Sequence, residues 1–133
     1  LPDIVTIKLG TNDSKPHNWQ HKDEFKHDLN TLLDSFSALP SSPRIYLCLP
    51  IPSENNAWGI NDSIISNCII PIIKEVAEER NISIIDLNTA MRPYYPNEYQ
   101  DGVHPNKYGA RIIAETIYKS ITGMKLLPES GHP

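Results

Sequence analysis

A carboxylate and an imidazole stand three residues apart in the segment Asp101-Gly102-Val103-His104-Pro105. Gly102 permits a turn through which Asp101 folds back onto the ring of His104. The carboxylate would fix the tautomer of that ring and stabilise its charged form, which leaves the other ring nitrogen free to accept a proton. The spacing predicts an oriented general base. The alternative is a loop in which both residues merely precede a helix.

A second polar segment, Gly10-Thr11-Asn12-Asp13, directly follows an apolar run that predicts a strand. Gly10 allows a tight turn at the end of that strand. Asn12 would then aim an amide donor into the crevice beyond the strand, as the stabilisation of an oxyanion requires. The alternative interpretation is that the Asn-Asp pair makes an Asx-type turn and has no chemical role.

Strands and helices alternate along the chain, and this alternation positions the two segments. The pattern predicts strands over residues 4–9, 44–49 and 82–86, and helices over residues 23–39, 61–80 and 106–122. Pro71 lies inside the second helix and predicts a kink or a late start. Because each crossover is helical, we expect an α/β, three-layer, flavodoxin-like fold with a parallel sheet and a crevice at the carboxyl ends of its strands. Asn12 would then lie across one crevice from the His104 ring, within about 10 Å.

Together the two segments resemble blocks of the SGNH hydrolases, also called GDSL esterases and lipases. Gly10-Thr11-Asn12-Asp13 resembles their G-x-N-D block, and residues 101–105 resemble their D-x-x-H-P block, in the same order along the chain. The resemblance implies a carboxylic-ester hydrolase in which His104 is the general base, Asp101 orients it and Asn12 is an oxyanion-hole donor. Within the family, the chain is most similar to bacterial esterases that remove acetyl groups from carbohydrates. The resemblance implies no metal and no organic cofactor.

The block that carries the nucleophile of this family, Gly-Asp-Ser, does not occur in the 133 residues. A further oxyanion donor of the family is a glycine upstream of G-x-N-D, and no residue here corresponds to it. Ser14 is the one hydroxyl close to Asn12 that a turn could bring to the crevice. We therefore expect that this chain alone forms no acyl-enzyme. The competing interpretation is a non-catalytic fragment or pseudo-enzyme module that binds a ligand or a partner chain.

Aromatic residues on the predicted loops are candidates for contact with substrate. Trp19 and Trp58 would stack on a sugar ring or line an acyl pocket, with plain anchoring of the loops as an equal alternative. Gly10, which opens the first loop, is grouped with them as a substrate-binding residue. His17 and His21 have the spacing of helical metal ligands, but no third ligand completes the set, so they indicate polar surface. A flavodoxin-like nucleotide binder is a more distant alternative, and the sequence has no Gly-rich phosphate loop.

Composition excludes several other classes of function. Lys and Arg number 12 and Asp and Glu number 16, and the resulting charge of −4 argues against nucleic acid or an anionic membrane surface as a partner. No apolar run approaches the roughly 18 residues of a transmembrane helix. Asn12 begins a glycosylation sequon, and a glycan there would abolish its predicted role. An unglycosylated bacterial protein, secreted or periplasmic, is therefore favoured.

The chain begins almost directly with a strand and has the look of a segment cut from a longer protein. We expect residues 1–123 to be the C-terminal portion of an SGNH-hydrolase domain whose N-terminal strands lie outside this chain, and residues 124–133 to be a tail. The first strand would then present an apolar edge, which is prone to association. We expect a second chain or the N-terminal segment to cover that edge.

Overall fold

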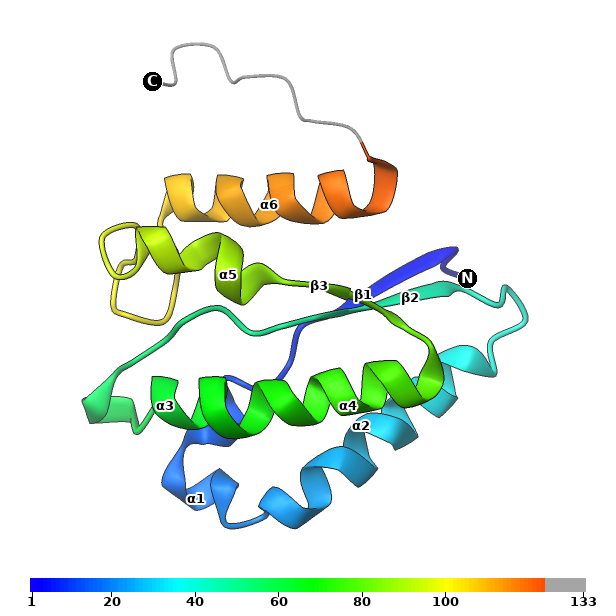
Figure 1. The fold of residues 1–133 in the computed structure, drawn as a ribbon, viewed down its shortest axis with the longest axis horizontal. Coiled ribbons are helices and arrows are strands. Elements are labelled where there is room, and N and C mark those ends of the chain that lie inside the picture. The colour runs from blue at the N-terminus through cyan, green and yellow to red at the C-terminus, as the bar shows by residue number, and fades with distance from the viewer. Residues whose placement is uncertain (124–133) are drawn as a thin grey trace.

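Three short parallel strands lie at the centre of the computed structural model, which describes residues 1–123 (Figure 1). β1 (Ile4–Ile7), β2 (Arg44–Cys48) and β3 (Ser83–Ile85) follow one another across the sheet in chain order. Their register places Ile4 beside Arg44 and Tyr46 beside Ser83. The predicted parallel pairing is confirmed, and the predicted tail, residues 124–133, lies outside the described residues.

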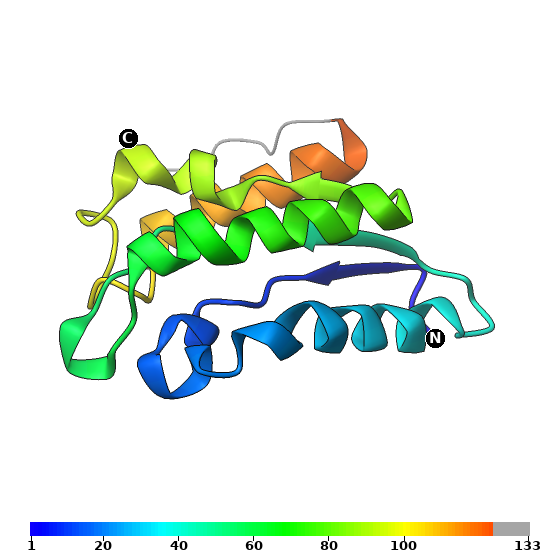
Figure 2. The same ribbon diagram turned by 60° about the horizontal axis from the view of Figure 1, so that its bottom comes forward.

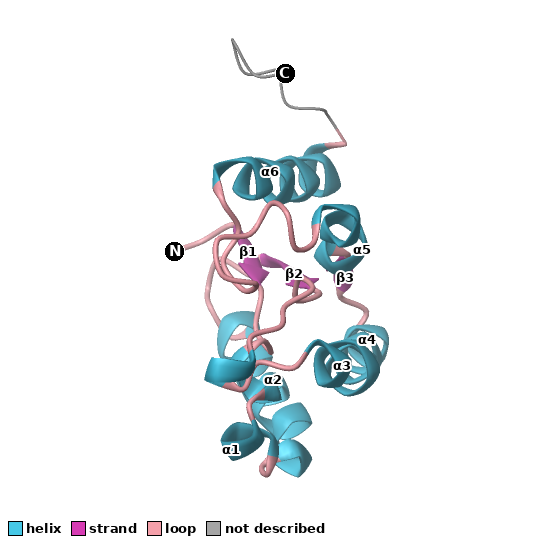
Figure 3. Ribbon diagram, turned by 90° about the vertical axis from the view of Figure 1, so that its left-hand side faces the viewer, coloured by secondary structure: helices cyan, strands magenta, loops and turns pink. Residues whose placement is uncertain are grey.

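Helices cover both faces of this sheet (Figures 2 and 3). The elements on one face are α2 (Lys22–Ser37) and α4 (Ile70–Arg80), and those on the other are α5 (Leu87–Met91) and α6 (Lys107–Thr122). The short helices α1 (Pro16–Trp19) and α3 (Asp62–Ile64) stand in the connections that follow β1 and β2. This is the predicted three-layer α/β arrangement. No helix within residues 1–123 is long and apolar enough to cross a membrane.

The central strand β2 explains why helices pack on both faces. Tyr46, Leu47 and Cys48 are all buried, and successive side chains of a strand point to opposite faces. Leu47 packs into a core with Leu33 of α2 and Val76 of α4, whereas Tyr46 and Cys48 pack with Ile85, Leu87 and Met91 on the other face. Each face of the sheet therefore has its own apolar core.

The helix predicted over residues 61–80 consists of three parts. Asn61 caps α3 by accepting a hydrogen bond from the backbone of Ile64, a π-helical segment spans Ile65–Ile69, and α4 begins at Ile70. Pro71 has no N–H to donate, and its ring would clash with the carbonyl four residues earlier in a continuous α-helix. The wider turn before Pro71 avoids this clash. The helical segment still begins at Asp62, directly after the predicted cap Asn61, so Pro71 interrupts the regular α-helix without delaying its start.

The first connection is more ordered than the sequence suggests. β1 ends at Ile7 rather than at residue 9, and residues 10–21, predicted as loop, contain the 3₁₀ turn Asn12–Ser14 and the helix α1. Pro16 occupies the first position of α1, where its missing N–H costs no hydrogen bond. This compact connection holds the predicted oxyanion donor directly beyond the end of β1.

β1 is the edge strand on one side of the sheet. Its neighbour Leu9 is 51% exposed and Ile4 is 42% exposed, although both are large apolar residues. Unpaired backbone groups and exposed apolar side chains on an edge strand favour pairing with a further strand. The predicted apolar edge is therefore present on β1.

Candidate active site

The loops that follow the strands enclose a cavity of about 560 Å³. Asn12 comes from the connection after β1, Trp58 from the connection after β2, and His104 from the loop before α6, and all three line this cavity. The prediction that the two polar segments share one rim is confirmed. The other lining residues are Lys8, Leu9, Gly10, Thr11, Asp13, Lys15, Ile51, Ile60, Val103 and Pro105.

Asp101 and His104 form the predicted dyad. One carboxylate oxygen of Asp101 lies 2.7 Å from Nδ1 of His104. The other oxygen accepts hydrogen bonds from the backbone N–H groups of Val103, at 2.9 Å, and of His104, at 2.7 Å. Because Nδ1 is occupied by the carboxylate, Nε2 is the ring nitrogen that can exchange a proton with a reactant. The geometry therefore suits a general base.

The pKa of the Asp101 carboxyl group lies below its ordinary value. The backbone N–H of His104 is the main cause, with further contributions from the His104 ring and the Val103 N–H, and together they lower the pKa of Asp101 from 3.8 to about 2. Since the folded value is depressed, the carboxylate's stabilisation of this turn is complete above pH 4. It is lost as the pH falls through about 2.

His104→Ala is expected to raise the pKa of Asp101 only part of the way to its ordinary value. Alanine removes the ring but keeps the backbone N–H at position 104, which is the largest cause of the shift. The ¹³C shift of the Asp101 carboxyl, followed against pH, measures this directly. A return to the full ordinary value would contradict the assigned order of causes.

Asn12 is held by its backbone and leaves its side chain available. Its carbonyl accepts hydrogen bonds from the N–H of Lys15, at 3.2 Å, and from the amide of Asn18, at 2.8 Å. Within residues 1–123 the side-chain amide of Asn12 makes no hydrogen bond, and the residue is exposed on the cavity wall. A fixed backbone with a free amide is the arrangement that an oxyanion donor needs.

Gly10 makes the turn that brings Asn12 to the cavity. Its φ is +126°, and a Cβ at this position would lie 2.8 Å from Cγ2 of Ile69. Only glycine satisfies both constraints without strain. The structure therefore gives Gly10 a conformational reason to be at this position, and it also lines the cavity as predicted.

Gly10→Ala is expected to lower the free energy of unfolding by about 2–4 kcal/mol, because backbone strain and overpacking each cost on the order of 1–3 kcal/mol. Gly123→Ala is the matched control. Gly123 also has a positive φ, +73°, but a Cβ there meets nothing within 4 Å, so the control carries only the backbone cost. Urea unfolding of both variants makes the comparison, and equal losses would contradict the predicted clash with Ile69.

Ser14 does not face the cavity. It is fully buried, its Oγ donates to the carbonyl of Thr11 at 2.7 Å, and it accepts from the N–H of Asn61 at 3.1 Å. The first contact closes the 3₁₀ turn on itself, and the second ties this turn to the start of α3. The hydroxyl therefore has a structural role, and the alternative of a nucleophilic Ser14 has no geometric support.

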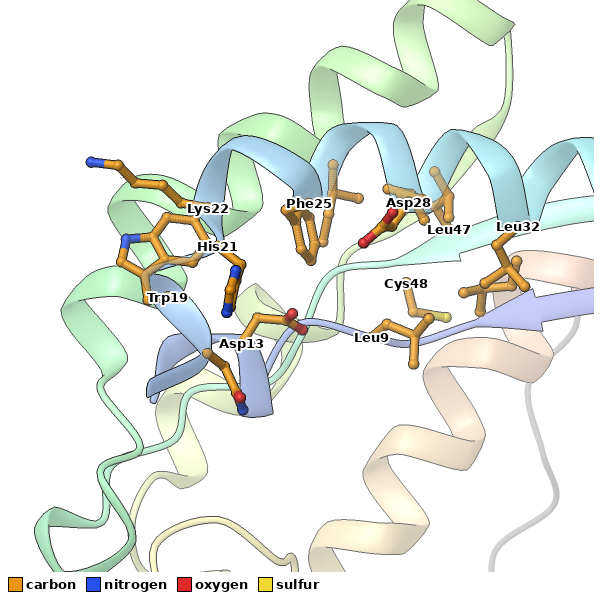
Figure 4. Close-up of a pocket in the computed structure, with 14 residues that line it drawn as sticks. Leu9, Asp13, Trp19, His21, Lys22, Phe25, Asp28, Leu32, Leu47 and Cys48 are labelled. Carbon is orange, nitrogen blue, oxygen red and sulfur yellow. The ribbon is translucent and has the colours of Figure 1, made fainter. Parts of the chain in front are cut away.

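The two tryptophans predicted to contact substrate lie in different places. Trp58 is 47% exposed and its ring lies 5.9 Å from that of His104, centroid to centroid, in an edge-on arrangement. Trp19 lines a separate pocket between β1 and α2, where it packs edge-on against Phe25 (Figure 4). The structure thus brings Trp58 to the candidate site and leaves Trp19 outside it.

Two groups of residues at the site were not anticipated from the sequence. Lys8 and Lys15 line the same cavity as Asn12 and bring positive charge to it. Glu54 and Asn55 bind the backbone of the loop that carries Asp101. The only sequence signal for the second group is the Asn-x-x-Trp spacing of a capped turn, which gives no information about the distant loop it contacts.

Comparison with known proteins adds an independent line of information. Residues 1–112 match the model of the GDSL-like lipase/acylhydrolase family. The chain is also 42% identical, over 137 residues, to an acetylxylan esterase of Xylanibacter ruminicola; the match covers 90% of this chain and 28% of that protein. The chain thus spans less than a third of this relative's length.

Solved structures share the fold. The lipase/acylhydrolase of Enterococcus faecalis superposes with a TM-score of 0.74 at 23% identity, covering 97% of this chain and 66% of that one. A catalytic mutant of Axe2, an acetylxylan esterase from Geobacillus stearothermophilus, gives a TM-score of 0.71 at 23% identity, with 96% and 63% covered. About a third of each solved chain therefore lies outside the matched part.

Proposed function

Because the chain belongs to the GDSL-like lipase/acylhydrolase family, we propose that residues 1–123 form the part of a carboxylic-ester hydrolase that carries its general base. The observation that carries the proposal is the Asp101–His104 dyad on the same cavity as the free amide of Asn12. His104 acts as base and then as acid, Asp101 orients it, and Asn12 donates to the oxyanion. The serine comes from a segment outside the 133 residues, because they contain no Gly-Asp-Ser block.

The reaction follows from this placement of groups. The serine oxygen attacks the acyl carbon while Nε2 of His104 takes the hydroxyl proton, and the carbonyl oxygen becomes an oxyanion beside Asn12. The C–O bond to the alcohol then breaks, and His104 returns the proton to the departing oxygen. Water repeats the sequence on the acyl-serine and releases the acid. No step requires a metal or an organic cofactor.

The proposed substrate is an acetyl ester of a carbohydrate. The relative with 42% identity is an acetylxylan esterase, and the half-exposed ring of Trp58 at the cavity offers an aromatic face to a sugar. The geometry gives Trp19 no such contact. Its predicted role at the substrate therefore lacks support from its position beside Phe25.

The edge of β1 is the proposed docking place for the serine-bearing segment. A pocket of about 290 Å³ lies between β1 and α2, and its apolar walls include Ile7, Leu9 and Phe25 (Figure 4). About a third of each solved chain of this fold lies outside its match to this chain, so further polypeptide accompanies these elements there. A strand paired with β1 would end beside Asn12, where the serine is needed.

The charge of this pocket favours the serine-bearing segment, rather than a second copy of this chain, as the partner of the β1 edge. Asp13 and Asp28 both line the pocket between β1 and α2, and neither forms an ion pair within residues 1–123. Burial raises the pKa of Asp13, and the nearby Asp28 carboxylate adds to the rise. Two copies joined edge to edge would bring four such carboxylates to one side of the sheet, whereas a segment with a basic side chain would neutralise them.

A protein in which a segment with a Gly-Asp-Ser block precedes residues 1–133, here termed the serine-bearing protein, tests the docking. The outward amides of β1 are expected to exchange with solvent at least about tenfold more slowly in it than in the 133-residue chain, because pairing protects them. The contact should bury more than about 1,000 Å² in total. Amides shared by β1 and β2 serve as the internal control. A monodisperse monomer of the short chain whose β1 edge is already protected would contradict the proposal.

The serine-bearing protein also tests the function. It should release acetate from acetylated xylan and from p-nitrophenyl acetate, and replacement of its block serine by alanine should abolish both reactions. A folded serine-bearing protein that releases acetate from neither substrate would overturn the proposal. The competing function, a non-catalytic module that binds a ligand or partner chain, is favoured by one observation: the serine nearest to Asn12 in the chain, Ser14, is buried, and its hydroxyl is bonded to the backbone of Thr11 and Asn61.

A further inference from the structure

The loop that carries Trp58 is fastened to the loop that carries the dyad. The N–H of Glu54 donates to the carbonyl of Gly102 at 3.0 Å, and the side-chain amide of Asn55 donates to the carbonyl of Asp101 at 3.0 Å. These residues are about 46 positions apart in sequence. The contact is close, because a Cβ on Gly102 would lie 2.3 Å from the carbonyl oxygen of Glu54.

Asn55 uses both ends of its side-chain amide. Its Oδ1 accepts the N–H of Trp58 at 3.1 Å and so caps the 3₁₀ turn Asn56–Trp58, while its Nδ2 donates to Asp101. The backbone of Asn55 also pairs with Ile60 in both directions, which closes the loop at its base. One side chain therefore fixes the turn that presents Trp58 and the backbone that presents the Asp101 carboxylate.

The two loops meet again at the cavity. The edge-on contact between Trp58 and His104, at 5.9 Å between ring centroids, joins the tip of one loop to the base residue of the other. His104 is otherwise open to solvent, with 65% of its side chain exposed. Its ring is thus restrained on one side by Asp101 and on another by Trp58, and both restraints depend on loops that Asn55 connects.

We propose that Asn55 is a positioning residue, which holds Trp58 and the Asp101–His104 dyad in register through its two amide contacts. The effect of Asn55 on catalysis rests on the proposed hydrolase function. The positioning itself involves only residues 54–60 and 101–104. It is therefore testable on the 133-residue chain without any hydrolysis.

Asn55→Asp is the informative variant. Aspartate keeps an oxygen to cap the turn at Trp58 but cannot donate to the Asp101 carbonyl, and its charge repels that oxygen. Asn61→Asp is the matched control, since Asn61 caps α3 through the N–H of Ile64 and makes no hydrogen bond with residues 101–104 in the described chain. Both variants add the same charge and retain the same type of cap.

Two measurements report on how Trp58 and the Asp101–His104 dyad are placed relative to each other rather than on overall stability. In a Trp19→Phe background, emission from Trp58 should fall as His104 becomes protonated, because an imidazolium quenches a neighbouring indole. Asn55→Asp should reduce this quenching at least twofold and shift the titration of the Asp101 carboxyl upward, while Asn61→Asp leaves both as in the parent. Unchanged quenching and an unchanged Asp101 titration in Asn55→Asp would overturn the proposal.

Gly102→Ala provides a second test of the same link should Asn55→Asp fail to fold. It leaves Asn55 intact and forces the two loops apart at Glu54, so it should weaken the quenching in the same way, while Gly123→Ala should not. In the serine-bearing protein, Asn55→Asp should lower kcat about tenfold to a hundredfold with little change in KM, as expected for misplacement by about 1 Å. If the optical effects occur but the parent hydrolyses nothing, the proposed function fails and the positioning role stands.

Discussion

The 133-residue chain is expected to hydrolyse p-nitrophenyl acetate no faster than an equal concentration of free imidazole. His104 and Asp101 form a prepared base, but the serine nearest to Asn12 along the chain is Ser14, whose hydroxyl is buried and bonded to the backbone of Thr11 and Asn61. Without a nucleophile, an oxyanion donor and a binding cavity give only a small fraction of the rate enhancement of a full triad. Initial rates, with imidazole as the reference, measure this directly.

Ser14→Ala is the control for this expectation. If the chain shows a burst of acylation that disappears in Ser14→Ala, then Ser14 is a nucleophile and its buried position is not the reactive one. If a slow background rate persists in Ser14→Ala and falls in His104→Ala, the activity is that of the exposed imidazole alone. Because Ser14 also fastens the 3₁₀ turn to α3, thermal unfolding of the variant must accompany the rate measurement.

The sequence was sufficient to predict the layers of the fold and the dyad because both depend on local pattern. The spacing from Asp101 to His104 allows one turn, and this turn is present with its carboxylate on Nδ1. The parallel order of the strands followed from the helical crossovers. Asn12 and His104 lie on one cavity because the carboxyl ends of parallel strands meet at one edge of the sheet.

What the sequence could not provide depends on contacts between distant residues. Trp19 and Trp58 both lie on connections after strands, and nothing local separates the one beside His104 from the one beside Phe25. The bond from Asn55 to Asp101 joins two loops with no shared pattern. The first connection was predicted as loop because its helical turns are too short to show an apolar period.

In the serine-bearing protein, His104→Ala is expected to lower kcat by about 10⁴-fold or more, because the loss of a triad base leaves only the contributions of binding and of the oxyanion hole. Asn12→Ala should cost less, about 10²–10³-fold, as for the removal of one oxyanion donor. KM should change little in either variant, since both groups act mainly in the transition state. Steady-state kinetics on p-nitrophenyl acetate give both values.

His27→Ala is the matched control for the base. His27 is an exposed histidine on α2 and does not line the candidate cavity, so its removal should leave kcat within about twofold, as expected for a surface substitution. Turnover that survives His104→Ala unchanged would show that this histidine is not the base, whatever its geometry with Asp101. A large loss in His104→Ala together with an unchanged rate in Asn12→Ala would instead keep the dyad and remove Asn12 from the oxyanion hole. In that case Lys8 and Lys15, which line the same cavity, are the next groups placed to stabilise the developing negative charge.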